Sequence, residues 1–166
     1  MTPHYPLVRQ TCLLLSGLVV ALCVSCSPSS EFEAQVLLPP QGWEQRNSVV
    51  FRYDNQDSLN SFQLGLHIRH EGNYPYRNLH TLCEVSGPDG DSLVWKNDIA
   101  LTDQEGRWLG QSALGDLYSV TALVQDSLHF KRKGLYTFRI RQNMRLDPLP
   151  SVVEVGWVVA RRTTND

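Results

Sequence analysis

The residue with the clearest chemistry in this chain is Cys26, which lies where an acylated cysteine would lie. It follows an apolar run from Thr11 to Val24 and the small residue Ser25. The run is shorter than the ~20 residues that a transmembrane helix needs, and it fits the hydrophobic region of an export signal. We therefore predict that residues 1–25 form a lipoprotein signal peptide and that the thiol of Cys26 is acylated.

Two other interpretations of this segment remain open. The neighbouring Cys23 offers a second thiol, although bulky Leu22 precedes it, and the segment could also be an ordinary secretory signal or an uncleaved anchor. If Cys26 is the acceptor, several acyl chains attach the protein to a membrane, each buried methylene contributing ~0.8 kcal/mol. Residues 26–31 then form the acylated cysteine and its tether, in which Ser27–Ser30 reach only ~13 Å.

No motif for catalysis or metal binding stands out. The chain has no Gly-x-Ser-x-Gly elbow, no His-Glu-x-x-His and no phosphate-binding glycine loop. His67 and His70 are three apart in a segment with strand periodicity, which puts them on opposite faces. Asp98, Asp103 and Glu105 are close in sequence, as in a hydrolase, but acids on such a loop are usually just solvated. We predict no enzyme activity, no metal site and no cofactor.

Four polar or aromatic residues close together in sequence form the first candidate recognition patch. Tyr74, Tyr76, Arg77 and Asn78 surround a proline at a turn-to-strand junction. Rigid rings and a planar guanidinium give contact area at low entropy cost, so the patch suits a partner protein. The alternative is structural, with the rings capping the edge of the fold and Asn78 bonding the backbone.

Trp108 and Arg145 are further candidates for binding. Trp108 stands between two glycines on a predicted loop, where it could stack on a sugar or a partner or plug one end of the fold. Arg145 follows a strand and could pair with Asp103 or Asp116 or bind a partner. Both alternatives stay open for each residue.

The elements that must position these residues are strands. Apolar and polar residues alternate with period two in five segments and more weakly in three others. The strong segments are 62–68, 79–85, 120–124, 136–140 and 153–159, and the weak ones are 32–37, 49–53 and 93–96. About eight short strands predict a single antiparallel β-sandwich domain over residues 32–166. Residues 97–117 read as a long excursion with at most one short helix or hairpin.

The net charge and the cysteine content limit which binding partners and which disulfides we expect. The formal net charge is −2 and no basic stripe occurs, so we expect no nucleic-acid partner. Once the signal peptide is removed and Cys26 is acylated, Cys83 is the remaining thiol, so no internal disulfide can form. The strand register points Cys83 toward the core, where a lone thiol is protected.

Several motifs along the chain carry a family resemblance. They are the Tyr-Pro-Tyr-Arg-Asn-Leu stretch of 74–79, Pro-Asp-Gly at 88–90, Gly-Arg-Trp-Leu-Gly at 106–110 and Gln-Asn-Met-Arg at 142–145. In order and spacing the chain resembles the gliding-motility lipoprotein GldH family of Bacteroidota, over roughly residues 43–159.

The resemblance implies a non-enzymatic lipoprotein with no cofactor. Its expected partners are the membrane, through the acyl chains, and other proteins of the gliding and type IX secretion machinery. The expected location is the outer membrane, on the periplasmic face. The alternative function is an envelope carbohydrate-binding module that uses Trp108 and the tyrosines as stacking platforms.

The sequence Asp-Ser-Leu occurs three times. Exported proteins of Bacteroidota are often O-glycosylated where Asp-Ser or Asp-Thr precedes an apolar residue, so the resemblance makes Ser58, Ser92 and Ser127 candidate acceptors. The alternative is that Asp-Ser simply begins a strand after a turn.

Overall fold

The computed structural model describes residues 30–113 and 115–162, so the predicted signal peptide and Cys26 lie outside the described residues. The described part forms nine strands, and it contains no helix long and apolar enough to cross a membrane. The strands are β1 (Phe32–Leu37), β2 (Val49–Asn55), β3 (Ser61–Glu71), β4 (Asn78–Ser86), β5 (Ser92–Ala100), β6 (Gln111–Ala113), β7 (Leu117–His129), β8 (Gly134–Gln142) and β9 (Val152–Arg161).

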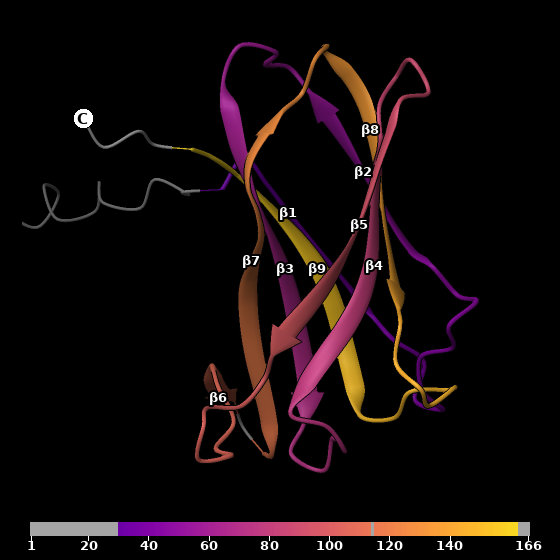
Figure 1. Ribbon diagram of the computed structural model, residues 1–166, viewed down its shortest axis with the longest axis vertical. Coiled ribbons are helices and arrows are strands. Elements are labelled where there is room, and N and C mark those ends of the chain that lie inside the picture. The colour runs from indigo at the N-terminus through magenta and orange to yellow at the C-terminus, as the bar shows by residue number, and fades with distance from the viewer. Residues whose placement is uncertain (1–29, 114, 163–166) are drawn as a thin grey trace, which may run out of the picture.

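The strands form two sheets that pack face to face (Figure 1). One sheet has the order β1-β9-β3-β7-β6 and the other has the order β2-β8-β4-β5. Every strand pair in both sheets is antiparallel. The predicted antiparallel β-sandwich is therefore confirmed.

All eight predicted strands are present, and the excursion between them is shorter than expected. β5 runs on to Ala100, and β6 is a short ninth strand inside the segment predicted as a loop. Between them Thr102 and Trp108 form an isolated antiparallel bridge, and Asp103 and Arg107 are joined by a backbone hydrogen bond of 2.9 Å. Of the two elements considered for this stretch, the structure has the hairpin.

The core forms where the inward rows of β3 and β9 meet those of β4 and β8. Along β3 the inward side chains Phe62, Leu64, Leu66 and Ile68 have no exposed surface. Trp157 of β9 is equally buried, and its ring centroid lies 5.3 Å from that of Phe138. These side chains alternate with half-buried or polar ones, which is the period-two pattern that predicted the strands.

Cys83 lies inside this core, as its strand register predicted. It has no exposed surface, and its sulfur accepts a hydrogen bond from Asn97 Nδ2 at 3.2 Å. Burial raises the pKa of the thiol to about 12. Since the thiolate is the reactive form, Cys83 is an inert packing residue.

Strand direction gives the sandwich two distinct ends. The start of β1 and the end of β9 lie at the same end, which is the top in Figure 1, together with loops 56–60, 87–91 and 130–133. We call this the near end, because the chain leads from it toward Cys26. Loops 72–77, 101–110 and 143–151 lie at the opposite end, which we call the far end.

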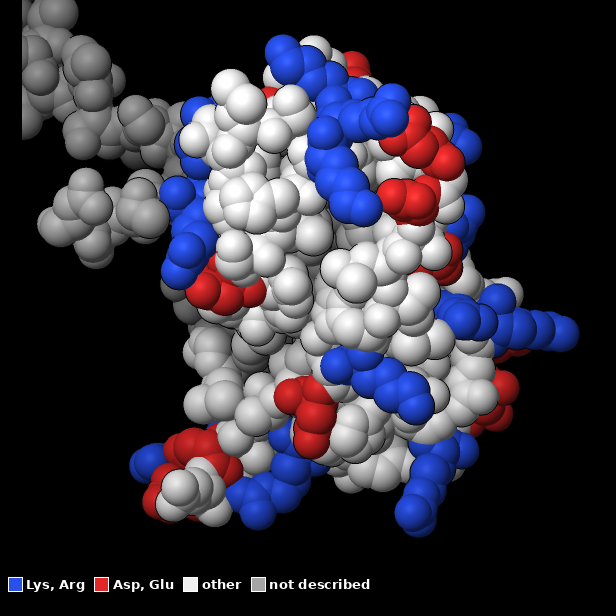
Figure 2. Space-filling model, turned by 45° about the horizontal axis from the view of Figure 1, so that its top comes forward, with Lys and Arg blue, Asp and Glu red and all other residues white. Residues whose placement is uncertain are grey.

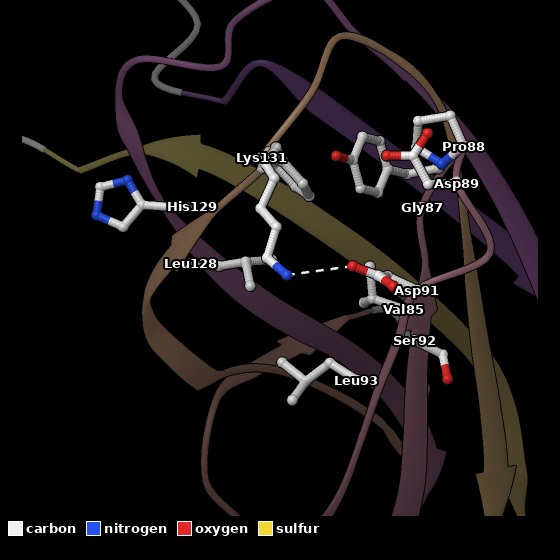
Figure 3. A pocket seen from close by; sticks show the side chains of 12 residues that line it. Val85, Gly87, Pro88, Asp89, Asp91, Ser92, Leu93, Leu128, His129 and Lys131 are labelled. Atoms are coloured by element: carbon white, nitrogen blue, oxygen red, sulfur yellow. Dashed lines mark hydrogen bonds and ion pairs between the residues drawn. The ribbon is translucent and has the colours of Figure 1, made fainter.

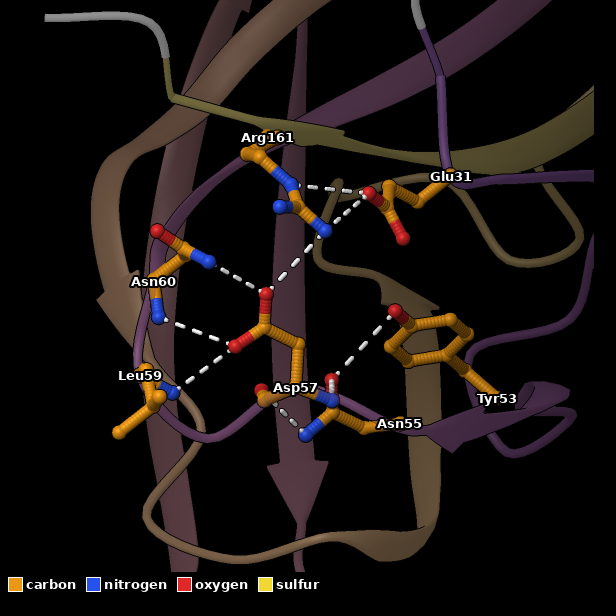
Figure 4. A network of polar contacts seen from close by, with 7 residues as sticks. All are labelled: Glu31, Tyr53, Asn55, Asp57, Leu59, Asn60 and Arg161. Carbon is orange, nitrogen blue, oxygen red and sulfur yellow. Dashed lines mark hydrogen bonds and ion pairs between the residues drawn. The ribbon is translucent and has the colours of Figure 1, made fainter.

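A polar network at the near end fixes the place where the chain enters the sandwich (Figure 4). The carboxylate of Asp57 accepts hydrogen bonds from the side chain of Asn60 at 2.5 Å and from the backbone amide of Leu59 at 2.9 Å. These bonds, that from the Asn60 side chain foremost, lower the pKa of Asp57 to about 2. Arg161 joins Asp57 at 3.1 Å to Glu31 at 2.8 Å. The first described residues are thereby tied to both β9 and the β2–β3 loop.

Candidate functional site

The candidate recognition residues all lie at the far end of the sandwich. They come from the β3–β4 loop and the start of β4, from the β5–β6 loop and from the β8–β9 loop. These residues are Tyr74, Tyr76, Arg77, Asn78, Trp108 and Arg145. Antiparallel topology brings the three loops to one end, although they are up to about seventy residues apart in sequence.

Tyr74 is a packing residue of this end. Its side chain is only 4% exposed, and its hydroxyl donates a hydrogen bond to the carbonyl of Asn78 at 3.0 Å. The ring centroid lies 5.6 Å from His70 and 6.4 Å from Trp108. Burial raises the pKa of its phenol. Of the two interpretations of Tyr74, the geometry agrees with the structural one.

Trp108 plugs the far end. Its half-buried ring meets the His70 ring edge-on at 4.6 Å and lies 6.0 Å from the ring of Tyr118. The bridge to Thr102 holds its backbone in place. This packing agrees with the plug interpretation and leaves less of the ring for stacking on a sugar.

Arg77 organises the neighbouring loop. Its Nη2 donates to the carbonyls of Asp103 at 2.7 Å and Gln104 at 2.8 Å, and its Nε donates to Thr102 Oγ1 at 3.1 Å. Three hydrogen bonds from one guanidinium hold the loop against the start of β4. The exposed side chain of Arg77 is thus already occupied by its own loop.

Arg145 differs from Arg77 in having no such bonds. The predicted ion pair with Asp103 or Asp116 is wrong, because Asp103 pairs instead with Arg107 at 2.8 Å. No residue in the described part of the chain forms an ion pair or hydrogen bond with the exposed Arg145 side chain. Arg107 lies only four residues after Asp103 in the same loop, so it is the nearer partner for that carboxylate.

Arg145 lines a hollow of about 370 Å³ at the far end. The other lining residues are Tyr76, Asn78, His80, Asn143 and Met144. The hollow forms because the amide of Asn143 donates to the carbonyl of His80 at 2.8 Å, which brings the end of β8 against β4. One aromatic ring, two amides and an unpaired guanidinium around one hollow can bind a polar or anionic group. Sequence reasoning missed His80 and Asn143, since only the strand register brings them together.

A second pocket, of about 450 Å³, lies at the near end between β5 and β7 (Figure 3). Its walls are largely apolar and include Leu93, Leu128 and Phe130. Lys131 and Asp91 form an ion pair of 3.1 Å at its edge, drawn as a dashed line in Figure 3. No sequence pattern indicates this pocket, because β5 and β7 are adjacent only in the packed sandwich.

The three Asp-Ser-Leu serines lie toward the near end. Ser92 and Ser127 are exposed and Ser58 is partly exposed. Asp57 and the residues after it form the hydrogen-bonded turn of Figure 4, which agrees with the turn interpretation at that position. Modification at these serines stays a prediction.

The two histidines of β3 point to opposite faces, as predicted. His70 is fully buried on the inner face, while His67 lies on the outer face with its Nε2 3.4 Å from Glu154. Among residues 30–113 and 115–162, no group of three His, Cys, Asp or Glu side chains could hold a metal ion. Burial lowers the pKa of both histidines below the usual 6.5.

These two histidines make stability depend on pH. Below pH ~6.5 these histidines bind protons in the unfolded chain but stay neutral in the folded protein. As the pH falls, the free energy of unfolding should therefore decrease by up to about 1.4 kcal/mol per pH unit for each histidine. Urea unfolding at about pH 7.5, 6.5 and 5.5 measures this slope. We expect His70→Gln to reduce this slope and to leave the part that His67 contributes. An unchanged slope in His70→Gln would show that His70 contributes nothing to it.

The family of the chain follows from comparison with known proteins. The GldH lipoprotein family model matches residues 30–159, so the chain belongs to the GldH lipoprotein family. It is 27% identical over 126 residues to a gliding motility lipoprotein GldH homolog of Christiangramia forsetii, covering 72% of this chain and 77% of that protein. It is 22% identical over 166 residues to the gliding motility lipoprotein GldH of Flavobacterium johnsoniae, covering 93% and 98%.

Two solved structures show a distant likeness to this chain. A family GH115 4-O-methyl-alpha-glucuronidase has a TM-score of 0.41 and 10% identity, covering 81% of this chain and 18% of the enzyme. Dimeric latent PorU from Porphyromonas gingivalis has a TM-score of 0.37 and 9% identity, covering 82% and 14%. Similarity this low carries no inference about function.

Proposed function

We propose that this chain is a membrane-anchored, non-enzymatic accessory or scaffold component of the machinery for gliding motility and type IX secretion. The observation that carries the proposal is the match to the GldH lipoprotein family over residues 30–159. The apolar run before Cys26 supports the membrane anchor.

The arrangement of the sandwich supports a binding role for the described part. The chain toward Cys26 leaves from the near end, and the hollow around Arg145 lies at the far end, away from that attachment. The buried thiol of Cys83 is inert, and His80 lies exposed and 3.6 Å from Asp98 rather than beside a nucleophile. Covalent catalysis needs an activated nucleophile beside a base, so the groups around the hollow suit recognition better.

We place the protein on the periplasmic face of the outer membrane. A tether of ~13 Å between Cys26 and the first described residue keeps the near end close to the bilayer. The far end then faces away from the membrane, where partner proteins of the machinery can reach it.

A carbohydrate-binding function is the second candidate. One observation favours it: Tyr76, Asn78 and Arg145 line one hollow. Their ring, amide and guanidinium are groups that bind sugars by stacking and hydrogen bonding. A glycan array would detect such binding, and Tyr76→Ala should then abolish it without unfolding the protein. If neither the wild type nor the variant binds a glycan, the sugar-binding function is wrong.

Removing the protein from its native host tests the main proposal. A deletion strain should secrete type IX cargo poorly and, if the host glides, should spread poorly on agar. Normal secretion and normal spreading in the deletion strain would contradict the proposed role.

A further inference from the structure

Five cationic side chains have neither an ion pair nor a hydrogen bond within residues 30–113 and 115–162. They are Arg52, Lys96, Lys133, Arg141 and Arg145. The other described cations have partners, such as Arg132 with Asp89 at 2.6 Å or Arg139 with Glu84 at 3.4 Å. Figure 2 likewise shows some Lys and Arg side chains beside acidic ones and others projecting alone. An unpaired cation is free to meet an anionic partner without first breaking a bond.

Four of these five lie on or beside the outer face of the four-stranded sheet. Lys96 of β5 and Arg141 of β8 both pair in register with Leu82 of β4, so they stand about 10 Å apart across it. Arg52 of β2 pairs with Thr137 of β8 on the same face. Their sequence neighbours point inward into the core, which fixes the outward direction of these side chains.

Arg145 extends this set to the far end. It follows β8 directly and lines the hollow with His80 and Asn78, which lie on the outward row of β4. We call Arg52, Lys96, Arg141 and Arg145 the basic face. The fifth unpaired cation, Lys133, lies in the loop before β8 at the near end.

Apolar side chains are interspersed among these cations. Val50 of β2 is 46% exposed, Val94 of β5 is 53% exposed and Leu135 of β8 is 52% exposed, all on the outward rows of the same sheet. Of the acidic residues on this face, Glu84 is paired with Arg139 and Asp98 accepts a hydrogen bond from Asn78 at 2.6 Å. The third, Asp54 of β2, is exposed and pairs in register with Leu135, so the unpaired cations still outnumber the acids that lack a cationic partner. Arginine is enriched at protein–protein interfaces, and the exposed valines and leucine beside these arginines offer apolar area that a partner can bury.

We propose that the basic face docks an acidic surface of a partner protein, with the hollow at Arg145 receiving a carboxylate. The proposal deepens the proposed function, on which it rests, by naming the surface and the charge of the partner. Unpaired guanidinium groups bind carboxylates in a two-pronged geometry, and the exposed valines bury apolar area beside them. A lipid surface fits less well, because the chain leads toward its anchor from the near end and Arg145 lies at the far end.

Site-specific crosslinking in the native host tests the proposal. A photo-reactive amino acid replaces Val94 on the basic face or, in a parallel strain, Leu123, which is 58% exposed on β7 of the other sheet. We expect the Val94 position to form an adduct with a protein whose crosslinked segment, read by mass spectrometry, is rich in Asp and Glu. The Leu123 position should not form this adduct.

Two variants with the same charge change make the test specific. Arg141→Glu should lower the yield of the Val94 adduct about tenfold, and Lys133→Glu should leave it unchanged within about twofold. Circular dichroism of both purified full-length variants checks that they remain folded. If Arg141→Glu does not fold, Lys96→Glu, on the exposed edge strand, takes its place with the same expected loss.

Three results would overturn the proposal. They are the absence of a protein adduct at Val94, an adduct with lipid only, and a yield that Arg141→Glu and Lys133→Glu change equally. Any of these, with impaired secretion in the deletion strain, would leave the proposed function standing and remove only the docking surface.

Discussion

Replacing Cys26 by alanine is expected to move the protein from the membrane fraction to the soluble periplasmic fraction. In the proposed lipoprotein the acyl chains on this one residue supply the attachment, at ~0.8 kcal/mol per buried methylene, so without them nearly all of the protein should become soluble. Fractionation of the native host followed by immunoblotting measures the distribution.

The matched control for this change is Cys23→Ala, which removes the neighbouring thiol and should leave the protein on the membrane. Release by Cys23→Ala but not by Cys26→Ala would identify Cys23 as the acylated residue. Retention of the Cys26→Ala protein through alkaline carbonate washing would instead show that residues 1–25 remain as an uncleaved anchor.

Trp157→Ala should destabilise the fold more than any surface change. The indole has no exposed surface and packs between the two sheets, with ring centroids 5.3 Å from Phe138 and 6.2 Å from Trp95. Removing a large buried aromatic side chain leaves a cavity and typically costs about 3–5 kcal/mol. Since a domain of this size is stable by about 5–15 kcal/mol, the variant should lose a large fraction of its free energy of unfolding.

Urea unfolding of the full-length variants measures this loss. The control is Leu135→Ala, a truncation on the exposed outer face of β8, which should change the free energy of unfolding by less than about 0.5 kcal/mol. A loss of under about 1.5 kcal/mol for Trp157→Ala would contradict the packing described for the centre of the sandwich.

The strands could be predicted from the sequence because each carries its own evidence. Apolar residues such as Phe62, Leu64, Leu66 and Ile68 alternate with other residues along one segment. This alternation predicts a strand with one buried face without any knowledge of the rest of the chain. The same local reasoning placed Cys83 in the core and His67 and His70 on opposite faces. The short strand β6 was missed because three residues are too few for a periodic pattern.

The far end could be predicted only in part, because it is assembled from loops distant in sequence. The sequence predicted Tyr76 and Asn78 within one patch and Arg145 separately, and the register between β4 and β8 brings all three to one hollow. Sequence reasoning also paired Arg145 with the wrong residue, because Asp103 forms its ion pair with Arg107 in the same turn. The basic face was invisible for the same reason, because its cations come from three strands and a loop.

The most direct test of the account is whether type IX secretion depends on this protein. We would delete its gene in the native host and measure cargo in the culture supernatant, with complementation by the wild-type gene and by the Cys26→Ala variant. The account predicts a strong loss of secreted cargo that the wild-type gene restores and the variant restores poorly. Secretion at the wild-type level without the protein, together with unchanged surface movement, would contradict it.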